Sequence, residues 1–238
     1  MGRGRGRAHG APRAGIRGVS AKPRPRAVRI SDAATRAQTR ALGAHRRALV
    51  SQLREEIGIP RVAVGRACLV MLMGLPGVGK SYCGAALAAT LGAAHVATDH
   101  LRSRLFIAAS YADEENAAVF GIAEALLDEL LAEGHVVVLD ATHVVARYRA
   151  PAEGVARTHG APLFHVLVTA DDADVRARLQ ARARERAPGD HSDADVRVYE
   201  RMRERVFEPP ATGYLEIHNG PNVAAEIARV ADLVLARP

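Results

Sequence analysis

Lysine is nearly missing from this sequence, since it occurs twice among 238 residues while arginine occurs 31 times. Tryptophan is absent, and no apolar run approaches the ~20 residues that a membrane-spanning helix needs. The charged N-terminus lacks the apolar core of a secretory signal. The two cysteines, Cys68 and Cys83, are too few and too far apart for a zinc ribbon or a C-x-x-C redox pair. We therefore expect a soluble protein of a reducing cytoplasm, with no membrane contact and two inert core thiols.

The net charge of +7 is confined to one end of the chain. Residues 1–30 hold nine of the 33 basic side chains and no acidic one. This leaves 24 basic and 26 acidic side chains, a charge of −2, in residues 31–238, which carry no overall nucleic-acid signature. The first 30 residues are rich in Gly, Pro and Arg, so we expect a disordered tail. It is interpreted either as a solvated tail, which we prefer, or as a weak nucleic-acid contact through arginine.

The rest of the chain divides into two parts by its hydrophobic pattern. Residues 31–66 predict an N-terminal helix and a connector, and residues 67–238 predict one α/β domain. The helix is expected over 32–57, because Gly-Ile-Pro at 58–60 ends it. We expect it to pack on the domain or on a partner chain through one apolar face, formed by Leu42, Leu49, Val50, Leu53 and Ile57.

From Cys68 onward, predicted strands and helices alternate, which favours a parallel sheet covered by helices on both faces. The predicted strands are Cys68–Met73, His95–Thr98, His135–Leu139, Leu163–Thr169 and Tyr214–His218. The predicted helices are Ser81–Leu91, Asp99–Ile107, Asp113–Glu133, Ala146–His159, Asp171–Glu185, Asp193–Phe207 and Val223–Ala236.

The segment GLPGVGKS at 74–81 fits G-x-x-x-x-G-K-[ST], the phosphate-binding P-loop. It follows an apolar strand and precedes an alanine-rich helix, which is the order that the motif requires. Backbone N–H groups of the glycine loop and the helix N-terminus then face an anion. A glycine-rich connecting turn is the alternative interpretation. We expect nucleotide binding by Gly74, Leu75, Pro76, Gly77, Val78, Gly79, Lys80, Ser81 and Tyr82.

Lys80 is the only lysine after residue 22 in a chain that uses arginine elsewhere. An ammonium is a compact point charge on a flexible stem, whereas a guanidinium is a bulky planar fork. Only the ammonium fits inside a loop that is wrapped around two phosphates. The sequence therefore predicts that Lys80 contacts the phosphates directly.

Two carboxylates follow predicted strands, at the edge of the sheet where ligands gather in open parallel folds. Asp140 ends the apolar run HVVVL and has the position of a Walker-B acid, which would hold Mg²⁺ together with the hydroxyl of Ser81. The alternative is that Asp140 caps the next turn. Asp99 with Arg102 three residues later would place a general base and a phosphate-gripping guanidinium on one helix face. The alternative is an N-cap Asp with a surface salt bridge.

A run of arginines leads into a Pro-Gly break at 188–189. Arginines on a hinged segment can close over a triphosphate and neutralise charge in the transition state. Most such arginines lie on a solvated helix face, and one or two are expected to be functional. The candidates are Arg178, Arg182, Arg184 and Arg186.

These segments together resemble the small P-loop kinases called predicted kinases of the AAA-domain type, which are related to polynucleotide kinases and zeta toxins. The motifs that carry the resemblance are GLPGVGKS, ATDHLRSRLF, GHVVVLDATHV and SDADVRVYERMRERVFEPP. The resemblance runs from about Cys68 to the C-terminus. It implies a three-layer P-loop NTPase fold with about five parallel strands and a helical lid, together with ATP, Mg²⁺ and phosphoryl transfer to an alcohol.

The resemblance also implies residue roles. Lys80 and Ser81 match the P-loop pair, and Asp99 resembles the general base. Arg102 resembles the arginine that holds the acceptor phosphate or the transition state. The remaining matches are Asp140 for the metal and Arg182 or Arg186 for the lid. The second Asp of the polynucleotide-kinase motif is replaced by His100.

Three functions stay open at this level. The first is a kinase that phosphorylates a hydroxyl of a small molecule or the 5′-hydroxyl of a polynucleotide. The second is a nucleotide-binding switch or docking module that hydrolyses ATP without an acceptor. The third is an RNA-associated protein whose basic tail recruits the substrate.

Overall fold

The computed structural model describes most of the chain beyond the basic tail. No placement is given for segment 1–30 or for Arg186, so the predictions made for them lie outside the described residues. The described residues are 37, 41–43, 45–59, 66–106, 111–185, 196–204 and 207–237.

Five parallel strands form one sheet in the order β2-β3-β1-β4-β5. The central strand β1 (Cys68–Met73) is completely buried, and β3 (Val136–Asp140) and β4 (Leu163–Thr169) pair with it on either side. The outer strands are β2 (Ala94–Ala97) and β5 (Leu215–His218). Apolar runs buried on both faces are typical of central parallel strands, and β1 begins and ends where the sequence predicts. The partly buried β4 also has its predicted bounds.

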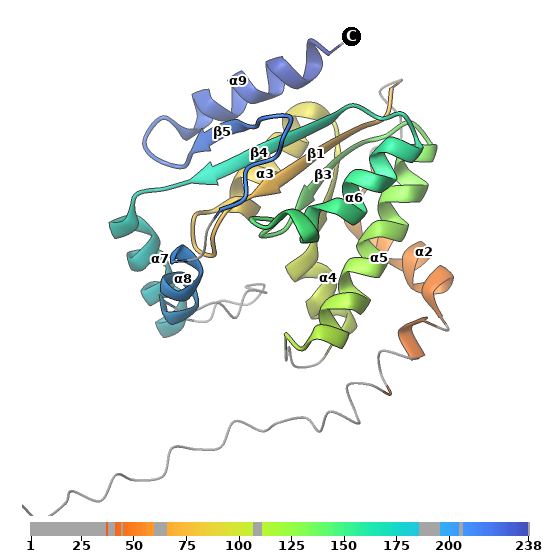
Figure 1. Ribbon diagram of the computed structural model, residues 1–238, viewed down its shortest axis with the longest axis horizontal. Helices are drawn as coiled ribbons and strands as arrows, with labels where there is room; N and C mark the ends of the chain where they lie inside the picture. The colour runs from red at the N-terminus through yellow and green to blue at the C-terminus, as the bar shows by residue number, and fades with distance from the viewer. Residues whose placement is uncertain are drawn as a thin grey trace, which may run out of the picture.

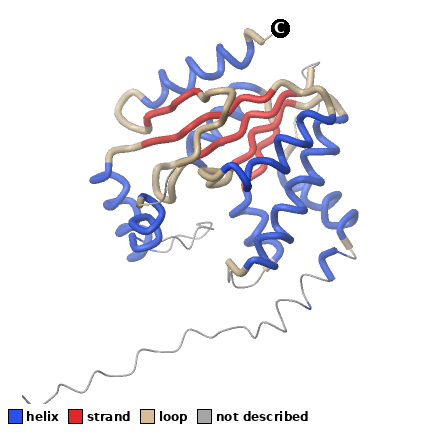
Figure 2. The backbone as a smooth tube through the Cα atoms, in the orientation of Figure 1, coloured by secondary structure: helices blue, strands red, loops and turns tan. Residues whose placement is uncertain are grey.

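Helices cover both faces of this sheet, so the molecule has three layers (Figure 1). One face is covered by α3 (Lys80–Leu91) and α9 (Val223–Leu235), and the other by α5 and α6 (Figure 2). The remaining helical bounds are α2 Arg46–Ile57, α4 Thr98–Leu105, α5 Asp113–Ala132, α6 Ala146–Thr158, α7 Asp172–Glu185 and α8 Val196–Arg203. The predicted three-layer α/β fold with a five-stranded parallel sheet is therefore confirmed.

Alternate side chains of the central strands belong to two separate hydrophobic cores, one on each face of the sheet. Leu69 and Met71 of β1 point to the core beneath α5 and α6, whereas Val70 and Leu72 point to the core beneath α3 and α9. This alternation follows from the two-residue period of a strand. Cys83 belongs to the second core, and burial raises the pKa of its thiol to about 11, as expected for an inert core thiol.

The N-terminal helix α2 packs on the domain, as one of the two predicted alternatives states. Val50 and Leu53 enter the core beneath α5, and Arg54 bonds to Glu129 of α5 at 2.9 Å and to Glu133, its C-cap, at 2.6 Å. The helix ends at Gly58, whose φ of 66° is the left-handed conformation that glycine adopts without strain.

The helix predicted over 32–57 is not continuous, because α2 begins only at Arg46, after a turn at His45. Some other predicted boundaries are wrong by one to four residues. Thr98 was expected to end a strand but begins α4, where its hydroxyl donates to the carbonyl of Asp140 at 3.2 Å. A threonine favours strands by its branching, and this contact with the neighbouring strand overrides that preference. The helix α8 ends at Arg203 rather than at Phe207. Within the described part of the chain, no helix is long and apolar enough to cross a membrane.

Candidate active site

The loop between β1 and α3 carries the P-loop motif, and two of its glycines lie against other parts of the chain. Gly74 has a φ of 146°, and a Cβ there would lie 2.5 Å from the carbonyl oxygen of Val168. Gly79 has a φ of 92°, and a Cβ there would lie 2.0 Å from Nδ2 of Asn219. Neither position can hold a side chain without moving its neighbours, so the motif glycines are required by this backbone.

The back of the loop is held by Asn219, which the sequence analysis missed, and by Arg178. Asn219, directly after β5, donates from Nδ2 to the carbonyl of Val78 at 2.8 Å, and its own N–H donates to Thr169 at 2.7 Å. Arg178 of α7 donates to the carbonyls of Val78 and Asn219, both at 3.3 Å. In the sequence, Asn219 could have been recognised as a polar residue directly after the last predicted strand. The sequence analysis considered Arg178 as a lid residue, but in the structure these two hydrogen bonds support the P-loop.

The side chain of Lys80 folds back into the loop, where Nζ donates to the carbonyl of Leu75 at 3.0 Å. Burial lowers the pKa of its ammonium, the negative charges of Asp140 and Asp99 act in the opposite direction, and Arg182 lowers it slightly. The lysine is therefore surrounded by the acidic and basic residues that the sequence singled out.

Asp140 is the last residue of β3 and is buried beneath the P-loop. Burial acts to raise the pKa of its carboxyl, but His95, Lys80 and the Ser81 hydroxyl together lower the pKa below its usual value. His95 Nε2 lies 3.7 Å from a carboxylate oxygen of Asp140. Asp140 is thus held as a carboxylate beside a serine hydroxyl, and hard oxygen ligands of this kind fit Mg²⁺.

Asp99 lies in the first turn of α4, directly after β2. The alternative that Asp99 is the N-cap of this helix is wrong, because Ala97 occupies the N-cap position. Burial raises the pKa of the Asp99 carboxyl, Lys80 opposes this effect, and Asp140 adds to it. No hydrogen bond of the Asp99 carboxylate is found among the described residues, and a half-buried carboxylate with a raised pKa is suited to proton transfer.

Arg102 is not a surface cation, so the alternative of a surface salt bridge between Asp99 and Arg102 is also wrong. Its side chain is buried, and its guanidinium donates to the buried carboxylate of Glu115 and, at 2.8 Å, to Asn116. The ring of Tyr111 lies 4.4 Å from the guanidinium carbon. The structure therefore pairs this arginine with residues of the chain around the start of α5.

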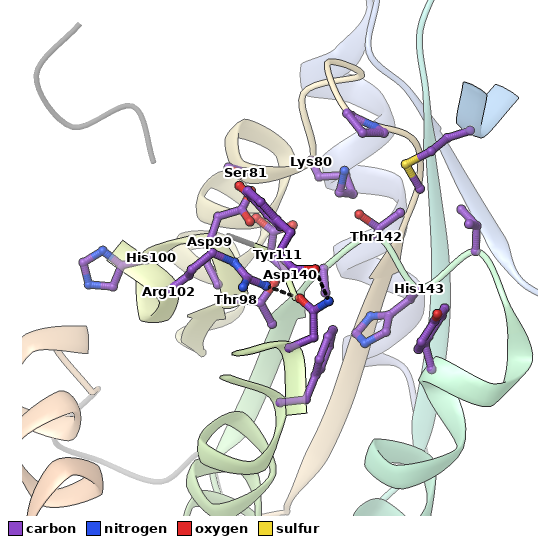
Figure 3. Close-up of a pocket in the computed structure, with 18 of the residues that line it drawn as sticks. Lys80, Ser81, Thr98, Asp99, His100, Arg102, Tyr111, Asp140, Thr142 and His143 are labelled. Carbon is purple, nitrogen blue, oxygen red and sulfur yellow. Dashed lines mark hydrogen bonds between the residues drawn. The ribbon is translucent and has the colours of Figure 1, made fainter. Parts of the chain in front are cut away.

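One cavity of about 1900 Å³ connects these groups. Figure 3 shows Lys80 and Ser81 from the start of α3, Asp99 from α4 and Asp140 from β3 around it. The predicted site residues that line the cavity are Pro76, Gly77, Gly79, Lys80, Ser81, Tyr82, Asp99, Arg102, Asp140, Arg178 and Arg182. The loop residues Gly74, Leu75 and Val78 are outside its lining and shape the loop from behind.

His143, three residues after Asp140, is a second site residue without a predicted role. Its φ of 44° is left-handed, a strained conformation for a residue with a side chain, which costs on the order of 1–3 kcal/mol. Nδ1 lies 3.2 Å from the carbonyl of Leu72, and burial lowers the pKa of the imidazole to about 4. A carbonyl only accepts, so Nδ1 carries the proton and Nε2 is a hydrogen-bond acceptor.

This neutral histidine predicts a pH-dependent stability. An unfolded histidine takes up a proton below about pH 6.5, whereas His143 in the folded chain does so only below about pH 4. We expect the free energy of unfolding to fall by up to about 3 kcal/mol between these pH values. The measurement is urea unfolding across this range, compared with His143→Asn, because asparagine tolerates a left-handed backbone. An unchanged pH dependence in the variant would contradict a buried neutral imidazole.

Comparison with known proteins places this site in a family. A family model described as an AAA domain matches residues 69–210, which is more than half of the chain and includes the P-loop, Asp99 and Asp140. The chain belongs to this AAA-domain family of P-loop kinases. No curated protein matches the chain by sequence.

Solved structures share the fold of this AAA-domain chain at low identity. The APS kinase CysC of Mycobacterium tuberculosis, in complex with AMPPNP and APS, is 23% identical with a TM-score of 0.53 over 72% of this chain and 99% of that one. Kti12 of Chaetomium thermophilum, in complex with ADP-AlF3, is 20% identical with a TM-score of 0.57 over 70% and 97%. A putative kinase of Chloroflexus aurantiacus is 17% identical with a TM-score of 0.58 over 71% and 97%. These similarities show a P-loop kinase-like fold.

Proposed function

We propose that the protein is an ATP-dependent kinase that transfers the γ-phosphoryl group of Mg·ATP to a hydroxyl group of an acceptor. The observation that carries the proposal is the position of Asp99. This carboxylate lines the same cavity as the P-loop lysine, and burial raises the pKa of its carboxyl. A nucleotide switch has no need of a base in this position, whereas a kinase needs one beside the γ-phosphate.

The proposed step forms a bond between the acceptor oxygen and the γ-phosphorus. The bond from the γ-phosphorus to the bridging oxygen breaks, and ADP leaves with its electron pair. Asp99 accepts the proton of the acceptor hydroxyl, and Lys80 offsets charge on the phosphate oxygens. Arg182 lines the same cavity and adds positive charge near Lys80 and Asp99, which supports its assignment as the lid arginine.

The implied metal fits the residues that are present. Ser81 and Asp140 would hold Mg²⁺, because a hydroxyl and a carboxylate kept in its charged form are the oxygen ligands that this ion prefers. When bound, Mg²⁺ neutralises charge on the phosphates. His95, 3.7 Å from Asp140, would orient that carboxylate from behind.

The test is an assay with γ-labelled ATP, Mg²⁺ and a panel of hydroxyl-bearing acceptors. The panel contains 5′-hydroxyl oligonucleotides, nucleosides, sugars and aminoglycosides. We expect label to move to one class of acceptor and ADP release to depend on that acceptor. Hydrolysis of ATP without transfer of label to any member would support the nucleotide switch instead.

A further inference from the structure

The arginine beside the proposed base is neutralised within the chain. Arg102 Nη1 donates to Glu115, and Nη2 donates to Asn116 at 2.8 Å. The side chains of Arg102 and Glu115 are only 5% and 1% exposed, so the pair is screened from water. Asn116 Nδ2 in turn donates to the carbonyl of Tyr111 at 3.1 Å, which ties the cluster to the start of α5. The positive charge of Arg102 is therefore compensated by the carboxylate of Glu115 inside the protein.

This arrangement is unsuited to an anionic group on the acceptor. A phosphate next to the reacting hydroxyl would have to displace Glu115 from Arg102 or lie beside its carboxylate, and both are unfavourable. A guanidinium that grips phosphate needs its paired N–H groups free for a bidentate contact. In Arg102, one N–H of each Nη is engaged by a protein oxygen, and Nε is buried without a hydrogen-bond partner among the described residues, so neither edge of the guanidinium is open for such a contact.

The other charged side chains on this side of the cavity are acidic. Among the described residues of α2, α4 and α5, Arg102 is the one arginine or lysine that lines the cavity. The same helices contribute the carboxylates of Glu56, Asp99, Asp113 and Glu124. Glu56 is paired with Arg104, which lies outside the lining, whereas burial raises the pKa of the Glu124 carboxyl. The cations that line the rest of the cavity come from α3, α6, α7 and α8, and they are Lys80, Arg147, Arg178, Arg182 and Arg201. The wall formed by α2, α4 and α5 is itself acidic, so it disfavours anions and accepts hydrogen bonds from hydroxyl or amine groups.

His143 and the aromatic side chains fit the same kind of ligand. Nε2 of His143 is a buried acceptor atom with no hydrogen-bond partner among the described residues, and the residue lines the cavity (Figure 3). Its ring packs against Phe120 at 5.9 Å, and Tyr111 adds further ring surface to the cavity wall. Ring faces with a few fixed hydrogen-bonding atoms are typical of sites for small molecules.

Building on the proposed kinase activity, we propose that the acceptor is a small polyhydroxylated molecule, either uncharged or carrying amines. It has no phosphate or carboxylate next to the hydroxyl that is phosphorylated. Arg102 is then a positioning residue, which joins α4, the helix that carries Asp99, to the start of α5 through Glu115 and Asn116. A polynucleotide 5′-end, which carries a phosphodiester near the reacting hydroxyl, does not meet this requirement.

The first experiment compares matched acceptors with the full chain, Mg²⁺ and ATP. Uncharged sugars and inositol form one arm, amino sugars form a second, and their phosphate- or carboxylate-bearing counterparts with a 5′-hydroxyl oligonucleotide form a third. We expect kcat/KM in the first or second arm to exceed the third by at least about tenfold. Preference for the third arm would overturn this inference but leave the kinase proposal intact. ATP hydrolysis with no acceptor-dependent transfer in any arm would overturn both.

The second experiment removes the negative charge that neutralises Arg102. Glu115→Gln removes the neutralising carboxylate and keeps the shape, so the ratio of kcat/KM for anionic over uncharged acceptors should rise by at least about tenfold. The matched control is Glu114→Gln, an exposed neighbour on the same helix turn, which should leave the ratio unchanged. An unchanged ratio in a folded Glu115→Gln protein would show that Arg102 does not set acceptor charge. If that variant fails to fold, the wild-type panel still decides.

Discussion

Lys80→Arg is expected to abolish turnover of Mg·ATP, and Lys80→Ala should do the same. The lysine lies folded inside the loop, where Nζ is 3.0 Å from the carbonyl of Leu75. A guanidinium keeps the positive charge but is a bulky fork, so the loop must open to admit it. We expect a loss of at least about 10²-fold in kcat/KM for the arginine variant.

The measurement for Lys80 is ATP binding and turnover, with circular dichroism and thermal unfolding as controls for the fold. Arg104→Lys is a matched control, because it exchanges the same two cations at an exposed ion pair with Glu56 and should leave turnover unchanged. Wild-type affinity and turnover in Lys80→Arg would refute the argument that a point charge is required.

Asp99→Asn is expected to lower phosphoryl transfer by about 10²–10⁴-fold while ATP affinity stays nearly intact. Asparagine keeps the size and polarity of the side chain but cannot take a proton. Because burial raises the pKa of Asp99, the wild-type rate should also fall on acidification through a pKa above that of an ordinary aspartate. This acidic limb should disappear in the residual activity of the variant.

Asp140→Asn serves as the comparison for Asp99→Asn. Its carboxylate is held in the charged form beside Ser81, so its loss should raise the Mg²⁺ concentration required for half-maximal rate. Magnesium titrations of both variants with an identified acceptor separate proton transfer from metal binding. A wild-type rate of phosphoryl transfer in Asp99→Asn would contradict the assignment of Asp99 as the general base and favour the nucleotide switch.

The parts of the site that the sequence predicts are those determined by local pattern. The P-loop is recognised because glycine, lysine and serine stand at fixed spacing between an apolar strand and a helix. Asp140 is recognised because a carboxylate ends the buried run of β3. Each signal is contained in a few neighbouring residues of the chain, and periodicity alone places it at the carboxyl edge of the sheet.

The contacts that the sequence does not predict join distant segments. Glu115 neutralises Arg102 only because α4 and α5 pack together, and its sequence context, an acidic first turn of a helix, gives no hint of burial. His143 Nδ1 reaches the carbonyl of Leu72 across 71 positions of the chain. Contacts of this kind depend on how helices pack on the finished sheet, for which a local pattern carries no information.

The bond from Asn219 to Val78 spans 141 positions of the chain. During synthesis the P-loop is made early, but the amide that holds its back emerges only after β5, beyond residue 210 where the family match ends. A nascent or shortened chain can therefore contain the whole motif and still lack the support of its loop. If the proposed site binds ATP, its affinity should therefore depend on complete folding of the chain, and bound ATP should in turn stabilise the attachment of β5 and α9.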